Sequence, residues 1–82
     1  MTAIEKLILR FKEKPNNFSY NELKKLLRSL GYAEKQGSGS RVIFVNRETG
    51  HKIKLHKPHP KTILKRYQLD LIEKELLQKD LI

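Results

Sequence analysis

The sequence predicts a single α+β domain in which helices cover one face of a three-stranded antiparallel sheet. Three observations lead to this prediction. Leucine-rich segments with helical spacing lie towards both ends of the chain, and alternating strand-forming residues lie between them. The length of 82 residues allows one domain with a small core.

The first expected helix covers residues 2–13. Its apolar side chains recur at the i, i+3, i+4, i+7 spacing of one helix face: Ile4, Leu7, Ile8 and Phe11. Residues 14–17, which include a proline and two asparagines, end it.

The second helix has the clearest start in the chain. Ser19 and Glu22 have the spacing of a capping box, and Phe18 can pack against Leu23 as a hydrophobic staple. Gly31 is placed for a left-handed cap, so we expect the helix to end at about Leu30. Its buried stripe consists of Leu23, Leu26, Leu27 and Leu30.

The predicted sheet contains residues 32–36, 41–46 and 51–55. A Gly-Ser-Gly-Ser turn joins the first two segments, and a turn with Gly50 in the left-handed region joins the last two. Two registers are open: a bulge at Gly50 pairs Val45 with Ile53, and a loop without a bulge pairs Phe44 with Ile53. In both, Ile53 and Leu55 face the helices while the opposite face carries Lys52, Lys54 and His56.

The closing helix is predicted over residues 62–82, with Leu69, Ile72 and Leu76 on one stripe. Its acidic residues outnumber its basic ones after Asp70, although the whole chain carries a net charge of +9. An acidic helix on a basic protein indicates either an internal counter-charge or a contact with a second subunit.

The positive charge is concentrated in residues 35–66, which contain nine Lys or Arg residues and only one acid, Glu48. This density predicts binding to RNA, to DNA or to an acidic protein partner. The sequence has no cysteine, which excludes disulfides and thiolate metal sites, and we expect no metal and no cofactor. It shows no membrane segment and no signal peptide, and we expect a cytoplasmic protein.

Histidine side chains in this basic window suggest a ribonuclease that works without a metal. Such an enzyme needs a base for the 2′-hydroxyl proton, an acid for the leaving oxygen and cations for the phosphorane charge. The candidates for proton transfer are His56 and His59, with His51 nearby. The candidate RNA-binding residues are Ser40, Arg41, Lys52, Lys54, Lys57 and Lys61. For each histidine, a surface imidazole with no catalytic role is the alternative.

Two other features have a functional and a structural interpretation. The amides of residues 37–40 could hold a phosphate, or the segment could be an ordinary turn. Tyr20, Tyr32 and Tyr67 could stack on bases, or they could be packing residues at helix boundaries.

The order of these motifs resembles the HicA toxins of bacterial toxin-antitoxin pairs. The similar features are SYNELKKLLRSLGY, the Gly-Ser turn opening the strand GSRVIF, a basic strand, Pro58-His59-Pro60 and a closing helix. The resemblance covers residues 19–76, so residues 1–14 are expected to be an accessory helix. It implies a fold similar to the double-stranded RNA-binding domain, cleavage of mRNA, and inhibition by a HicB-type antitoxin.

The sequence departs from this family at one important position. The family's catalytic histidine follows the Gly-Ser pair, and here Arg41 follows Gly39-Ser40. Arginine stays protonated and cannot act as a base, but it can bind a phosphate or stabilise a charged transition state. Two extra residues before Pro58 shift His59 relative to the family pattern.

Three hypotheses follow from the sequence. The chain is a HicA-like toxin that cleaves mRNA with His59 or His56, with Arg41 stabilising charge. Alternatively, it is an RNA-binding module on the same fold that has lost cleavage. In the third, its basic face serves only to bind an acidic protein.

Overall fold

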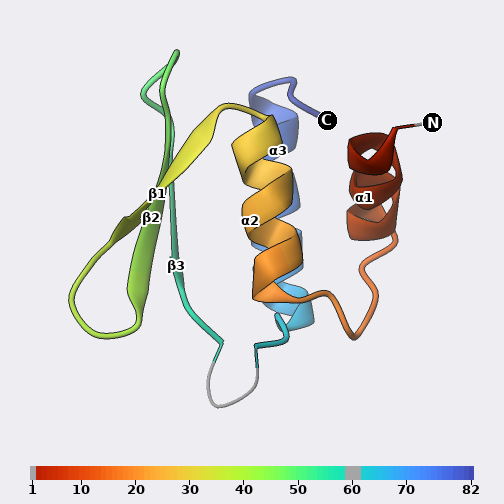
Figure 1. The fold of residues 1–82 in the computed structure, drawn as a ribbon, viewed down its shortest axis with the longest axis horizontal. Helices are drawn as coiled ribbons and strands as arrows, with labels where there is room; N and C mark the ends of the chain where they lie inside the picture. Colours follow the sequence, from red (N-terminus) through yellow and green to blue (C-terminus); the bar gives the residue numbers. More distant parts are fainter. Residues whose placement is uncertain (1, 59–61) are drawn as a thin grey trace.

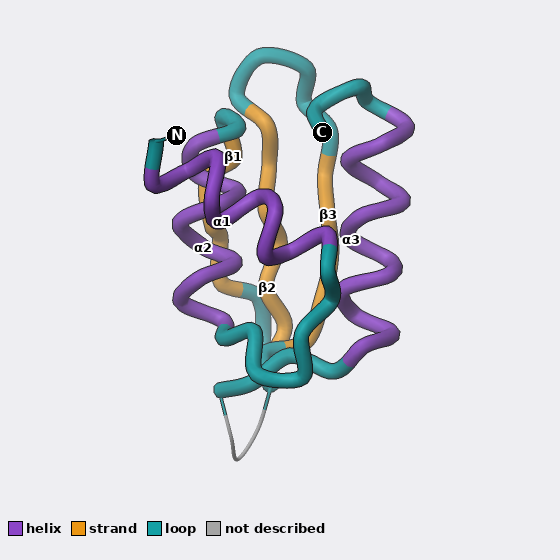
Figure 2. Tube along the Cα trace, turned by 90° about the vertical axis from the view of Figure 1, so that its right-hand side faces the viewer, coloured by secondary structure: helices purple, strands orange, loops and turns teal. Residues whose placement is uncertain are grey.

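A sheet forms one layer of the molecule, and helices form the layers behind it (Figure 1). The structure is a computed structural model and describes residues 2–58 and 62–82. In these residues α1 (Ala3–Lys12) and α2 (Tyr20–Ser29) precede β1 (Tyr32–Gln36), β2 (Arg41–Asn46) and β3 (Lys52–His56), and α3 (Arg66–Gln78) follows. Helices α2 and α3 cover one face of the sheet, and α1 crosses them on the side away from it (Figure 2). The predicted α+β class is confirmed.

The sheet is antiparallel with the strand order β1-β2-β3. Phe44 pairs with Ile53, which is the register expected for a loop without a bulge. Because side chains alternate along a strand, this register turns Val42, Phe44, Ile53 and Leu55 towards the helices, where all are buried. The opposite face of β3 carries Lys52, Lys54 and His56, all exposed, as predicted.

Helix α2 begins and ends as the sequence predicts. The Ser19 hydroxyl accepts a hydrogen bond from the Glu22 amide at 3.1 Å, and the Glu22 carboxylate accepts one from the Ser19 amide at 3.0 Å. Gly31 follows the helix with a φ of +94°, a left-handed conformation that a side chain would strain. The leucine stripe of α2 packs into the core together with Phe11, Phe18, Leu69, Ile72 and Leu76.

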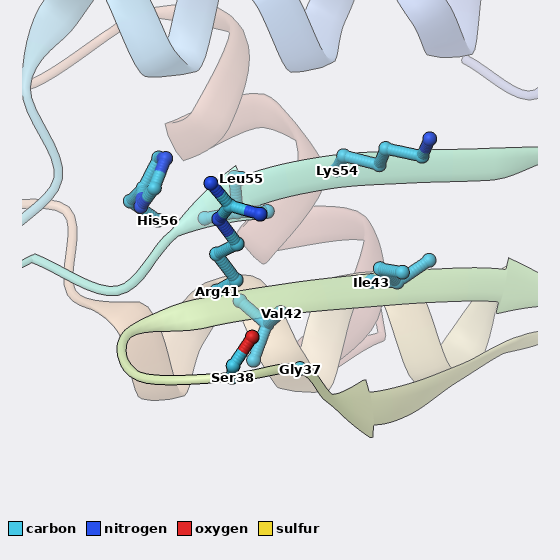
Figure 3. Close-up of a pocket in the computed structure, with 8 residues that line it drawn as sticks. All are labelled: Gly37, Ser38, Arg41, Val42, Ile43, Lys54, Leu55 and His56. Carbon is cyan, nitrogen blue, oxygen red and sulfur yellow. The ribbon is translucent and has the colours of Figure 1, made fainter.

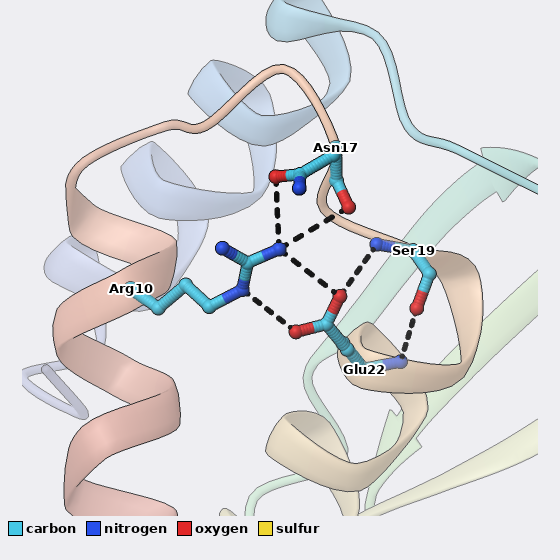
Figure 4. Close-up of polar contacts among 4 residues, drawn as sticks. All are labelled: Arg10, Asn17, Ser19 and Glu22. Carbon is cyan, nitrogen blue, oxygen red and sulfur yellow. Dashed lines mark hydrogen bonds and ion pairs between the residues drawn. The ribbon is translucent and has the colours of Figure 1, made fainter.

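Helix α1 is attached to both neighbouring helices. The Phe11 ring contacts Phe18 edge-on, with their centroids 5.6 Å apart. Arg10 donates to the Glu22 carboxylate at 2.8 Å and also to Asn17 (Figure 4). Just after the same end of α1, the Lys14 ammonium lies 2.6 Å from Asp70 and 2.9 Å from Glu73 of α3. Two sets of ion pairs therefore hold α1 against the α2 and α3 layer.

The closing helix is shorter than predicted, because it begins at Arg66 instead of residue 62. Residues 62–64 are held in an extended conformation by the chain entering α2. The Thr62 carbonyl accepts from the Tyr20 amide at 2.8 Å, and the Leu64 amide donates to the Phe18 carbonyl at 2.9 Å. The bond from Tyr20 occupies the Thr62 carbonyl, which a helix would need for its first turn, so the prediction was wrong for this segment. The helix ends at Gln78, ahead of residue 82.

Two buried amide side chains fasten the ends of the sheet to the helices. Asn46 donates to the Leu30 carbonyl, and its oxygen accepts from two amides of the β2–β3 turn. Gln68 accepts from the Lys65 amide and donates to the His56 carbonyl, both at 3.0 Å. Neither of these roles was predicted from the sequence.

Candidate functional site

The face of the sheet that the helices leave uncovered is strongly basic. Arg41 pairs with His56 across β2 and β3, Ile43 pairs with Lys54, and Val45 pairs with Lys52. On the other side of β2, Lys35 pairs with Ile43, so it lies on the same face. We call this set the basic face; its exposed members are Lys35, Arg41, Lys52, Lys54 and His56.

Arg41 and His56 form one end of the basic face. Figure 3 shows the Arg41 side chain leaving β2 and reaching towards His56 on β3. Both line a hollow of about 430 Å³, to which Gly37, Ser38 and Lys54 also contribute. The Ser40 hydroxyl lies 3.4 Å from Nδ1 of His56, so the ring presents Nε2 as its remaining nitrogen. A guanidinium and an imidazole therefore line one exposed hollow.

The β1–β2 turn places Arg41 in this hollow. The Gly37 amide donates to the Arg41 carbonyl at 2.8 Å, and the Arg41 amide donates to the Ser38 carbonyl at 3.3 Å. A Cβ atom at Gly37 would lie 3.1 Å from the Arg41 Cβ, and Gly39 has a φ of +64°. The amides of Ser38, Gly39 and Ser40 donate no hydrogen bond to any residue that the structure describes. The segment is thus a tight turn, and it keeps three donors available beside Arg41.

The charges of the basic face are not neutralised by the acidic last helix. The carboxylates of Asp70 and Glu73 pair with Lys14, and that of Glu75 pairs with His51. Within residues 2–58 and 62–82, no ion pair reaches a side chain of the basic face.

A protein-family model matches most of the chain. Residues 20–77, more than half of its length, match the family model of the HicA toxin of bacterial toxin-antitoxin systems. The chain belongs to the HicA toxin family. It is therefore the toxin of a toxin-antitoxin pair, and the family implies an antitoxin as its partner. No curated protein and no solved structure gave a significant match.

In this HicA toxin, His51 lies apart from the hollow. Its ring stands between two other elements, with Nδ1 2.7 Å from the Tyr32 hydroxyl and Nε2 2.8 Å from the Glu75 carboxylate. The side chain is nearly buried. Since both nitrogens are occupied, His51 connects β1 to α3 and is not free to bind a substrate.

The other candidate residues do not all lie on the basic face. The Lys57 ammonium lies 5.9 Å from the centroid of the Tyr20 ring, on the helix-covered side, so Lys57 does not join the basic face. Ser40 is exposed next to His56. His59 and Lys61 lie outside the described residues. Lys35 was not among the binding residues predicted from the sequence, although its place in the alternation of β1 gives the correct face.

Two further findings concern other kinds of site. In the described part of the toxin, no cluster of three or more His, Asp or Glu side chains could hold a metal ion. No helix within residues 2–58 and 62–82 is long and apolar enough to cross a membrane.

Proposed function

We propose that this HicA toxin binds RNA on its basic face and cleaves it without a metal ion. One observation carries the proposal: Arg41 and His56 are cross-strand partners in an exposed hollow, on a face whose cations have no carboxylate partner in the described chain. Phosphates of the RNA would replace the missing counter-charges.

The proposed reaction is attack of a ribose 2′-oxygen on the adjacent phosphorus. His56 takes the 2′-hydroxyl proton on Nε2 while the new oxygen–phosphorus bond forms. Arg41 binds the phosphate oxygens and stabilises their charge in the transition state. The bond from phosphorus to the 5′-oxygen then breaks, and that oxygen receives a proton from an acid, for which His59 is the candidate from the sequence.

A second candidate function is RNA binding without cleavage. It is favoured by Arg41 itself, which follows Gly39-Ser40 where the family resemblance places a catalytic histidine. Arginine supplies phosphate binding but no proton transfer. In this case the same basic face would hold RNA, and His56 would contribute a contact instead of a base.

The antitoxin is proposed to be a HicB-type protein that covers the basic face. An acidic surface on that partner would satisfy the same cations as RNA does, so toxin inhibition and RNA binding would exclude each other. Helix α1 lies outside the family match and contributes nothing to the basic face. We therefore interpret residues 1–14 as an accessory helix of a single domain whose HicA core covers residues 19–76.

The test is incubation of the purified toxin with a labelled single-stranded RNA in the presence of a chelator. We expect cleavage that leaves a 2′,3′-cyclic phosphate, reduced about 10²- to 10⁴-fold in His56→Ala. His59→Ala tests the candidate acid, and Arg41→Ala tests charge stabilisation. Lys25→Ala, which removes an exposed cation of α2, is the control and should cleave normally. Intact RNA that stays bound to the wild type would instead support the binding module, and absence of binding would contradict both functions.

A further inference from the structure

A second hollow lies beside the first, between β3 and α3. Its volume is about 130 Å³, and α3 contributes Tyr67, Leu71 and Ile72 to it. Lys54, Leu55 and His56 line both hollows. The second hollow therefore continues the first one, where the RNA phosphate is proposed to bind, towards α3. Arg41 does not line it, and apolar side chains of α3 do.

The aromatic ring in this hollow is exposed, unlike the other two tyrosines. Tyr20 and Tyr32 are 8% and 3% exposed, and their hydroxyls bind Glu34 and His51. Tyr67 is 66% exposed. It belongs to no buried cluster, so its ring is available to a ligand.

The position of Tyr67 relative to His56 is fixed by its neighbour. Gln68 is buried and donates to the His56 carbonyl at 3.0 Å. Its oxygen also accepts from the Lys65 amide, which holds the first turn of α3 in place. The ring therefore projects from a backbone that is tied directly to the residue proposed as the base.

We propose that Tyr67 stacks on an unpaired base of the RNA whose neighbouring phosphate lies at Arg41 and His56. This inference rests on the proposed function and adds a residue that binds a base of the single-stranded RNA. Bases in a duplex stack on each other, so only a single strand can offer a free face to an aromatic ring. The hollow suits this occupant, because Leu55 and Leu71 are apolar while Lys54 lies on the phosphate side.

The competing occupant is an apolar segment of the antitoxin. The observations favour the base, because the hollow is small and is continuous with a cationic site that selects phosphate. The exposed apolar surface of α3 also includes Leu77, which does not line this hollow. Leu77 therefore provides a matched control for general loss of apolar surface on the same helix.

The experiment measures affinity of the full-length toxin for 2′-O-methyl oligouridylate, which lacks the attacking hydroxyl, and for an abasic strand of equal length. Tyr67→Ala should weaken binding to oligouridylate roughly 5- to 150-fold and leave binding to the abasic strand unchanged. Tyr67→Phe keeps the ring and should bind like the wild type, as should Leu77→Ala.

The outcomes separate this inference from the proposed function. If the wild type binds neither strand, the proposed function fails and the stacking site fails with it. If it binds both strands equally and Tyr67→Ala changes nothing, RNA binding stands and stacking is overturned. A Tyr67→Ala variant that binds oligouridylate normally but no longer captures the antitoxin would also overturn it, in favour of a protein contact.

Discussion

The charged side chains of the helix layers and those of the basic face are arranged in opposite ways. Between the helices, Arg10 pairs with Glu22 and Lys14 pairs with Asp70 and Glu73. On the basic face, no cation has a carboxylate partner among the residues described. Paired charges position α1, whereas unpaired like charges repel one another and destabilise the fold slightly unless a ligand neutralises them.

The two described histidines show the same contrast within a few residues of chain. His51 is enclosed and hydrogen-bonded at both nitrogens, and His56 is exposed beside Arg41. We expect substitutions in the helix layers to change stability, and substitutions on the basic face to change binding.

The largest effect should come from removing three cations of the basic face together, in Arg41→Gln, Lys52→Gln and Lys54→Gln. Each phosphate contact with single-stranded RNA contributes about 0.7 to the slope of log K against log salt. The triple variant should therefore bind RNA on the order of 100-fold more weakly at 0.1 M salt, with a slope smaller by about 2. A salt titration of RNA affinity measures both quantities.

The matched control neutralises two cations that are already paired, in Arg10→Gln and Lys14→Gln. This double variant should keep the RNA affinity and its salt slope, and should unfold at a lower temperature. A loss of log affinity in the double variant about two thirds as large as in the triple variant, in proportion to the charges removed, would show that net charge alone decides binding and would end the distinction between the two regions.

A smaller effect is expected for His51→Ala, and it should appear in stability. The substitution leaves the buried Tyr32 hydroxyl without its partner, which costs about 1–3 kcal/mol. His56→Ala removes an exposed ring and should change the free energy of unfolding by less than about 0.5 kcal/mol. Urea denaturation of both variants tests this. A large destabilisation by His56→Ala would contradict its assignment to a binding surface.

The smallest expected effect is a loss of folding stability at acid pH. A hydrogen bond from Arg10 lowers the pKa of the Glu22 carboxyl, and one from Lys14 lowers the pKa of Asp70. The unfolded chain therefore binds more protons than the folded chain as the pH falls through the ordinary carboxyl range, at about 4, so stability decreases there. The decrease is complete once the pH is below the lowered pKa values of the folded state.

Thermal unfolding between neutral and acid pH measures this dependence. Glu22→Gln is a suitable comparison because glutamine can still accept in a capping box while it carries no charge. Together with Asp70→Asn it should reduce the fall in unfolding temperature between neutral and acid pH. If the unfolding temperature of the double variant falls with pH as much as that of the wild type, other carboxylates cause the decrease.

The parts of the fold that depend on nearby residues were predictable from the sequence. The capping box of Ser19 and Glu22 needs only one turn of helix, and the alternation in residues 51–55 separates the two faces of β3. The face of Lys52, Lys54 and His56 was assigned for the same reason, whereas the pairing of Arg41 with His56 depended on a hairpin register that the sequence left open.

The features that the sequence did not predict depend on contacts between distant segments of the chain. Residues 62–64 resemble a helix start, and only their bonds to Phe18 and Tyr20 keep them extended. The role of His51 follows from Tyr32 and Glu75, which are 19 and 24 residues away. The alternation of residues 51–56 places His51 on the side of Ile53 and Leu55, opposite His56, but it carries no information about the partners of His51.

The two hydrogen bonds made by the Gln68 side chain have a mechanical consequence for control of the toxin. One amide group joins the first turn of α3 to the backbone of His56, so a shift of the helix also moves the backbone that carries the imidazole. An inhibitor that pulled on α3 could thus misalign the imidazole from a distance, without ever entering the hollow.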